Sequence, residues 1–284
     1  MDKLIINAAL TGMVPTRRDS PHVPLRVEEI VADARRCCDA GASIVHLHAR
    51  DDDGEPTYCA DVYGRIIAGV RAACPDLIVC VSTSGRRHRE LWQRGQVLRL
   101  PPPLRPEMAS LTLGSMNFPS EASLNPPSII EGLARTMNEN RIVPELEVFD
   151  LGMVDYGRYL IDKGHLRPPF YCNILLGSRG TLAATPLNLA LVAQALPHGT
   201  TWAAAGIGRF QFSTNLLAIA MGGHVRVGLE DNLHFDAART RLATNAELID
   251  RLAGVARAMG REIATATEAR AVIGLRGERA SQAA

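Results

Sequence analysis

Two histidines separated by one residue are the strongest chemical signal in this sequence. His46 and His48 lie in the apolar run Ser43–Ala49, which has the composition of a buried β-strand. Alternate residues of a strand point to one face, so the two imidazoles project together. Together they can supply two nitrogen ligands to a divalent metal such as zinc. A lone core histidine is usually structural, but this pair, followed by the polar loop 50–54, predicts a metal site.

A third metal ligand is expected from the last strand-like segment, His224–Glu230. In a closed barrel this segment and the histidine strand are separated only by the first strand, and neighbouring strands lie about 4.8 Å apart. Glu230 is then the natural third ligand, and the open metal position suits chemistry on a carbonyl or a water. Arg226 shares strand parity with Glu230, whereas Asp231 reaches the site only if the strand ends there. The alternative for Arg226 and Asp231 is a structural ion pair.

Other polar side chains are expected at strand ends near the same point. Ser82 ends the third strand and opens a turn whose hydroxyl and N–H groups suit a carboxylate, although many such turns look alike. Ser110 lies in the fourth strand. Glu145 and Glu147 share one face of the fifth strand. Glu147 is nearer the carboxyl end and is the candidate for a substrate contact, whereas Glu145 suits an inner polar layer.

These residues need a scaffold, and the chain predicts an α/β fold in the form of a (β/α)₈ TIM barrel. Strand-like runs alternate with helical patterns, and 284 residues with 46% hydrophobic content suit one domain, 1–284. A doubly wound sheet is the rival, but residues 8–12 lack its glycine-rich phosphate turn. The expected strands are Leu4–Ala9, Ser43–His48, Leu77–Ser82, Met108–Thr112, Glu145–Phe149, Phe170–Leu176, Thr201–Ala205 and His224–Glu230, and the clearest expected helices are Val27–Ala40, Tyr63–Ala73, Ser128–Asn138 and Pro186–Ala195.

Composition narrows the class of partner. The net charge of +1 gives no general attraction to nucleic acid or to an anionic membrane. No spanning helix or signal peptide is expected, which favours the cytoplasm and a small-molecule partner. The six cysteines form no C-x-x-C pair and suit reduced packing residues.

Four segments resemble the β-keto acid cleavage enzyme family. They are residues 6–9, 41–48, 145–150 and 221–232, and the likeness extends over nearly the whole chain. It implies a TIM barrel and a reaction in which a β-keto acid and acetyl-CoA give acetoacetate and a new acyl-CoA. It also implies a homo-oligomer, a tetramer in the family.

The resemblance also implies roles for residues of this chain. Zinc (Zn²⁺) is held by His46, His48 and Glu230 and polarises the carbonyl of the keto acid. Arg226 and Asp231 form the acid–base pair that removes a proton from C2. The substrate carboxylate binds Ser82 and Ser110, and Glu147 corresponds to an active-site glutamate.

A basic segment, Arg86-Arg87-His88-Arg89, precedes three prolines at 101–103. As a solvated loop it needs no function. With a polyanionic cosubstrate, however, Arg86 and Arg87 are expected to bind the phosphates of CoA, since guanidinium groups match phosphate oxygens.

One position departs from the family. The member that acts on a 5-amino keto acid has a glutamate after the first strand, where this chain has Val14 beside Met13. An ammonium there would lose hydration without gaining a partner, so we expect a substrate with an uncharged distal side chain. Arg17 and Arg18 leave an anionic group as the alternative.

Two other functions remain compatible with these residues. A metal-dependent aldolase or hydrolase would use the same ligands without CoA, so dependence on acetyl-CoA separates it from the acyltransferase. A binding protein for metal or metabolite is the non-enzymatic alternative. Measured turnover in the presence of zinc would exclude it.

Overall fold

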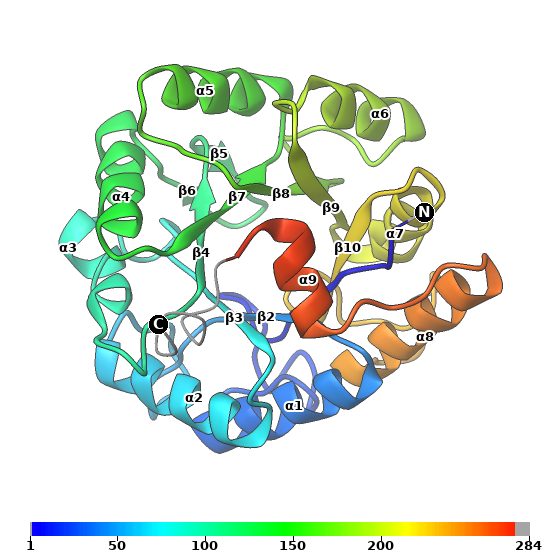
Figure 1. Ribbon diagram of the computed structural model, residues 1–284. Coiled ribbons are helices and arrows are strands. Elements are labelled where there is room, and N and C mark those ends of the chain that lie inside the picture. The colour runs from blue at the N-terminus through cyan, green and yellow to red at the C-terminus, as the bar shows by residue number, and fades with distance from the viewer. Residues whose placement is uncertain (1, 276–284) are drawn as a thin grey trace, which may run out of the picture.

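The computed structural model describes residues 2–275, which form a closed barrel of eight parallel strands ringed by helices (Figure 1). The TIM barrel predicted from the sequence is therefore confirmed. The barrel strands are β1 (Ile6–Ala9), β2 (Ile44–Leu47), β3 (Ile78–Val81), β4 (Met108–Thr112), β7 (Val143–Val148), β8 (Phe170–Leu176), β9 (Thr200–Gly206) and β10 (His224–Val227). They follow one another in chain order, and β10 closes the barrel against β1.

Helices connect successive strands on the outside of the barrel. Two of them, Val27–Ala40 and Pro186–Ala195, have the predicted bounds. Gly41 ends the first of these in a left-handed conformation, with φ of 113°, which glycine adopts without steric cost. The helices are α1 (Val27–Ala40), α2 (Ala60–Ala73), α3 (Leu91–Arg94), α4 (Pro127–Glu139), α5 (Leu151–Asp162), α6 (Pro186–Ala195), α7 (Gln211–Ala220), α8 (Asn245–Ala258) and α9 (Ala266–Ile273), with 3₁₀ turns η1 (Val97–Arg99) and η2 (Gly208–Phe210).

The two ends of the barrel interior differ in chemistry. At the amino-terminal ends of the strands, Ile5, Ile44 and Ile78 form an apolar layer that packs against Ile273 of α9. Figure 1 shows α9 lying across this end of the barrel. The opposite end carries the polar strand-end residues, as in other TIM barrels.

Two local features differ from the sequence prediction. The hairpin of β5 (Met116–Asn117) and β6 (Ala122–Ser123) is inserted between β4 and α4, and its strands are too short to give an alternating pattern. The last barrel strand ends at Val227 rather than at Glu230. Gly228 ends it, with φ of 157°, and a Cβ there would lie 2.0 Å from the carbonyl oxygen of Ala9.

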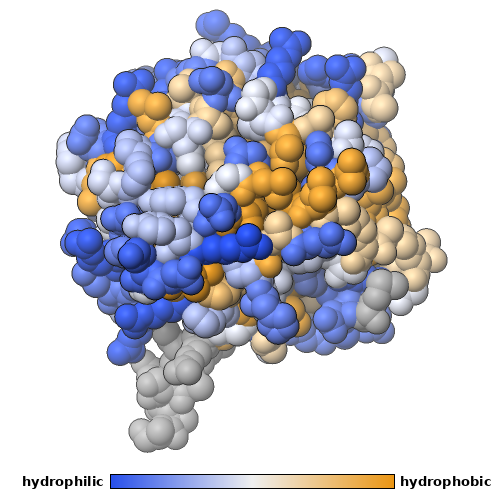
Figure 2. All heavy atoms as spheres, turned by 90° about the horizontal axis from the view of Figure 1, so that it is seen from above, coloured by the Kyte–Doolittle hydropathy of each residue, from blue (hydrophilic) through white to orange (hydrophobic). Residues whose placement is uncertain are grey.

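One side of the molecule is apolar. Figure 2 shows hydrophobic residues gathered on the side where α6 lies, to the right of the view. Leu187 and Leu191 of α6 are 67% and 43% exposed. Within the described residues, no helix is both long and apolar enough to cross a membrane, and all six cysteines are free.

Candidate active site

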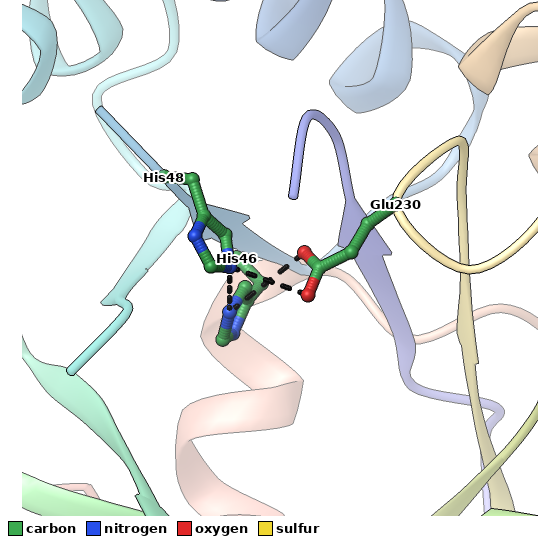
Figure 3. Close-up of side chains that lie close together, drawn as sticks. All are labelled: His46, His48 and Glu230. Atoms are coloured by element: carbon green, nitrogen blue, oxygen red, sulfur yellow. Dashed lines mark hydrogen bonds and ion pairs between the residues drawn. The ribbon is translucent and has the colours of Figure 1, made fainter. Parts of the chain in front are cut away.

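Three side chains from opposite ends of the sequence converge at the carboxyl end of the barrel (Figure 3). His46 lies in β2, His48 follows it, and Glu230 follows β10. The two Nε2 atoms are 3.3 Å apart. Glu230 Oε1 lies 3.2 Å from His48 Nε2, and Oε2 lies 3.9 Å from His46 Nε2. Strands β2 and β10 both pair with β1, which brings these residues together as the sequence predicted.

The donor set fits a catalytic zinc ion. Two imidazole nitrogens and one carboxylate oxygen, all within 4.8 Å of one another, leave a fourth tetrahedral position open. Glu230 Oε2 and His48 Nδ1 are buried without a hydrogen-bond partner. The Oε2 atom is therefore a buried acceptor near His46 Nε2, and a bound metal ion would satisfy it.

Glu145 orients the first of these histidines. Its Oε2 lies 2.6 Å from His46 Nδ1, and its Oε1 accepts a 2.6 Å hydrogen bond from Asn7 Nδ2. Because a carboxylate only accepts, Nδ1 carries the proton, which leaves the Nε2 lone pair directed at the site. Burial alone would raise the pKa of Glu145, but His46 and Arg226 hold it well below its usual range. The sequence placed Glu145 in an inner polar layer, and it does lie fully buried inside the barrel.

Glu230 reaches the site through a turn rather than through strand parity. The strand has ended, and the turn is tied by Asn245 Oδ1, which accepts from the N–H of Leu229 at 2.7 Å. Gln211 Nε2 donates to the carbonyl of Gly228 at 2.9 Å. Gly12, with φ of 68°, leaves room for the carboxylate arm, since a Cβ there would lie 2.6 Å from Glu230 Cγ. Strand parity therefore does not place Glu230, because β10 ends at Val227, but the residue still reaches the expected point.

Arg226 is a buried cation surrounded by carboxylates. It is 1% exposed. Its guanidinium donates to Glu230 at 2.7 Å, to Glu147 at 3.1 Å and to Asp231 at 3.1 Å. Burial raises the pKa of both Glu147 and Asp231 above the ordinary values, although Arg226 opposes the shift. A carboxylate with a raised pKa next to an open metal position is suited to accept and return a proton.

A cavity of about 940 Å³ opens above these residues. Ten of the residues singled out from the sequence line it: Met13, Val14, His46, His48, Ser82, Arg86, Glu147, Arg226, Glu230 and Asp231. The arrangement brings a candidate metal site, the buried cluster of Arg226 with its carboxylates and a large cavity to one point.

Two of the predicted site residues do not line this cavity. Ser110 is buried one layer lower, and its Oγ accepts from the N–H of Thr83 at 3.1 Å. Strand pairing sets Ser110 beside Glu145 and Thr112 beside Glu147, so the cavity floor lies at the second pair. Arg87 is exposed and pairs with Glu121 at 3.4 Å.

Several residues that line the cavity were not predicted from the sequence. Thr112 lines the cavity and donates to Glu147 Oε2 at 2.7 Å. Thr112 is the last residue of the predicted strand Met108–Thr112, and functional residues of a TIM barrel lie at such strand ends, so its position could have indicated it. Phe118 on the hairpin and the loop residues Arg179, Arg209 and Arg239 also line the cavity, and irregular loops give no periodic signal.

Comparison with known proteins identifies relatives that match nearly the whole chain. The family model described as beta-keto acid cleavage enzyme matches residues 3–275. A 3-keto-5-aminohexanoate cleavage enzyme of Fusobacterium nucleatum is 40% identical over 97% of this chain and 99% of its own length. A 3-oxoadipate:acetyl-CoA acetyltransferase of Cupriavidus necator is 37% identical over 95% of this chain and 94% of its own.

The likeness to solved structures supports the fold alone. The apo structure of ObcA is 23% identical and superposes with a TM-score of 0.81, over 90% of this chain and 66% of that chain. Sequence identity over the full length and the match to the family model together place this chain in the β-keto acid cleavage enzyme family.

Proposed function

We propose that this enzyme is a zinc-dependent acyltransferase that converts a β-keto acid and acetyl-CoA into acetoacetate and a new acyl-CoA. The observation that carries the proposal is the convergence of three metal-type ligands with the cluster of Arg226, Asp231 and Glu147 in one cavity. Acetyl-CoA is the cosubstrate named for the Cupriavidus relative.

The metal ligands in this proposal are His46, His48 and Glu230. When bound, zinc supplies a Lewis acid for the keto oxygen of the substrate. The chain's own residues then handle the proton, because Asp231 is buried, has a raised pKa and is held by the Nε–H of Arg226. Asp231 accepts the C2 proton, and C2 bonds to the acetyl carbon as CoA leaves.

The second half of the reaction returns CoA to the substrate. The sulfur of CoA bonds to the keto carbon, the bond between C2 and C3 breaks, and Asp231 returns its proton to C2 of the departing acetoacetate. Arg226 keeps Asp231 and Glu147 in place through both halves, since its guanidinium contacts both carboxylates. Fixed donors around developing negative charge are the usual source of catalysis at such sites.

Hydroxyl groups at the cavity wall suit the carboxylate of the keto acid. Ser82 lines the cavity at the end of β3, and Ser84 follows it. Ser110 is placed to support this turn rather than to contact substrate, because its Oγ is bonded to the N–H of Thr83. Arg86 lines the same wall and is half-buried, which favours a contact with the substrate carboxylate over the CoA role expected from the sequence.

The proposed substrate has a distal side chain without positive charge. Met13 and Val14 line the cavity. Glu147, Glu230 and Asp231, the carboxylates of the cavity lining, are all bonded to Arg226. Neither Arg17, which pairs with Glu29, nor Arg18 lines the cavity.

We also propose that the apolar face around α6 is covered by a second copy of the chain. Leu187 and Leu191 are exposed there, and α6 is mostly apolar, with Asn188 and Gln194 as its polar residues. Helices of that composition are normally buried, and large exposed apolar patches mark interfaces.

The reaction is tested by incubating the zinc-loaded protein with 3-oxohexanoate, with and without acetyl-CoA, and measuring acetoacetate. Formation of acetoacetate only with acetyl-CoA is expected. Consumption of the keto acid without acetyl-CoA would instead identify an aldolase or hydrolase, and no turnover with zinc would leave a binding protein.

Substrate choice is tested with 3-oxohexanoate, 3-keto-5-aminohexanoate and 3-oxoadipate under identical conditions. We expect kcat/KM to be about two orders of magnitude higher for 3-oxohexanoate than for its amino analogue, because an ammonium beside Val14 lacks a partner. Val14→Glu should narrow or reverse this preference. If the unaltered protein turns over 3-keto-5-aminohexanoate best, Val14 does not contact the distal group of the substrate. If it turns over 3-oxoadipate best, an arginine contacts that distal group.

A further inference from the structure

Three exposed arginines stand on the rim of the cavity, one in each of three neighbouring loops. Arg179 follows β8, Arg209 follows β9 and Arg239 follows β10. These strands are adjacent in the barrel (Figure 1), so the loops form one continuous arc. All three arginines line the cavity that contains the metal ligands.

Their positive charges are not neutralised by the protein. Within residues 2–275, none of the three forms an ion pair with a carboxylate. Arg209 lies over the ring of Phe210, and Arg239 Nε is 3.4 Å from His234 Nδ1. The carboxylates that line the cavity are already bonded to Arg226. The arc therefore presents three guanidinium groups to whatever enters.

The basic segment 86–89 has a different character. Arg87 is paired with Glu121 outside the cavity, and His88 Nε2 lies 3.2 Å from the carbonyl of Pro56. Arg86 is the one member of the segment that lines the cavity, and its guanidinium lies 3.8 Å from the centre of the Phe118 ring. This segment offers one inward charge, whereas the arc offers three on the rim.

We propose that Arg179, Arg209 and Arg239 bind the phosphates of the CoA cosubstrate, an assignment that rests on the function proposed above. CoA carries a diphosphate and a 3′-phosphate at one end of its pantetheine arm and the reacting thioester at the other. With the thioester at the metal site, the phosphates lie at the cavity mouth. Guanidinium groups bind phosphate oxygens in pairs and steer anions toward the mouth.

The test replaces all three arginines by glutamine in the zinc-loaded protein. Calorimetry with CoA measures binding without turnover, and initial rates give KM for acetyl-CoA and for the keto acid. We expect CoA to bind at least about tenfold more weakly, with a parallel rise in KM for acetyl-CoA and little change in KM for the keto acid, because several charge-assisted contacts are lost. Unaltered protein should likewise bind 3′-dephospho-CoA more weakly than CoA.

A matched variant separates local contacts from the loss of net charge. Arg135, Arg167 and Arg257 are exposed and do not line the cavity, and their joint replacement by glutamine removes the same charge. It should leave CoA binding close to that of the unaltered protein. Equal weakening in the two triple variants, or unchanged binding in the rim variant, would overturn the assignment.

The variant Arg87→Gln tests the alternative site for the phosphates. If it loses more CoA affinity than the triple rim variant does, the phosphates bind the segment 86–89, and the assignment to Arg179, Arg209 and Arg239 is wrong. If the unaltered protein binds no CoA and turns over keto acid without acetyl-CoA, the proposed function fails, and this assignment fails with it.

Discussion

At the scale of single residues, the site depends on buried charges that satisfy one another. Arg226 is enclosed by Glu147, Glu230 and Asp231, and removing one member of such a network leaves an uncompensated buried charge. His46 is held between Glu145 and the proposed metal. Substitutions at these positions should therefore separate loss of metal from loss of proton transfer.

The first expectation concerns the metal. His46→Ala should lose both zinc and activity, because two ligands bind zinc much less well than three. Zinc content per chain, measured on purified protein, checks the first effect independently of turnover. His198→Ala, at an exposed histidine outside the cavity, is the matched control. Full zinc occupancy with normal turnover in His46→Ala would show that the metal binds elsewhere.

The second expectation concerns the base. Asp231→Asn should keep zinc and the fold but lower kcat by about 10²- to 10⁴-fold, because an amide cannot accept the C2 proton. Exchange of the C2 hydrogen with deuterated water, followed by NMR, should slow in parallel. A near-normal kcat would show that another group is the base. Glu147 is the next candidate, because its pKa is also raised and it also contacts Arg226.

At the scale of elements, the seam between β1 and β10 closes the barrel, and the turn that follows it carries Glu230, the proposed third metal ligand. Val225 pairs with Ile6, and the turn after β10 is tied to β1 by the N–H of Glu230, which donates to Ala9 at 3.2 Å. His224 begins this seam, and its Nδ1 accepts from the N–H of Ile5 at 3.0 Å. The same strand thus anchors the barrel at one end and positions the site at the other.

The third expectation is that the stability of the fold depends on pH through His224 in this seam. Burial, together with Arg261, lowers the pKa of His224 from 6.5 to about 4. Between those values the unfolded chain binds a proton that the folded chain does not, so stability is complete above pH 6.5 and falls as the pH approaches 4. A shift from 6.5 to about 4 corresponds to at most about 3 kcal/mol.

Urea unfolding of the unaltered protein and of His224→Asn at pH 7 and pH 5 measures this effect. Asparagine can still accept from the N–H of Ile5 but does not titrate. The loss of unfolding free energy on acidification should therefore be smaller in the variant. An identical loss in both proteins would show that other groups control acid stability.

At the scale of the whole molecule, the barrel separates its functions in space. One end is closed by α9 over an apolar layer, the other holds the cavity, and the side around α6 is apolar. Neither Leu187 nor Leu191 lines the cavity, so the apolar face and the cavity wall do not share these residues.

The fourth expectation follows from the α6 face. Leu187→Glu combined with Leu191→Glu should lower the mass measured by light scattering to that of a single chain, since burying two charges at an apolar interface is unfavourable. Met259→Glu, at an exposed apolar residue after α8, should leave the mass unchanged. A monomeric unaltered protein would refute the interface.

The sequence by itself determined the eight barrel strands and the residue types that their ends carry to the site. The alternation of β and helical patterns predicted the barrel, and the period of two in the run Ser43–His48 predicted that His46 and His48 lie on one face. The chain order of the strands then predicted that β10 would bring Glu230 to them. These features are local or topological, and local patterning is sufficient to specify them.

Only the tertiary structure decided how deep in the barrel each site residue lies and which way its side chain points. Strand parity puts Ser110 and Thr112 on the same face, but the stagger of the barrel puts Thr112 at the cavity floor and Ser110 below it. Arg86 and Arg87 are adjacent in sequence, yet one lines the cavity and the other pairs with Glu121 outside it. Glu230 is aimed by a turn that begins at Gly228 and is held by Gln211 of α7 and Asn245 of α8. Such contacts depend on how distant segments pack, and no periodicity in the chain encodes that packing.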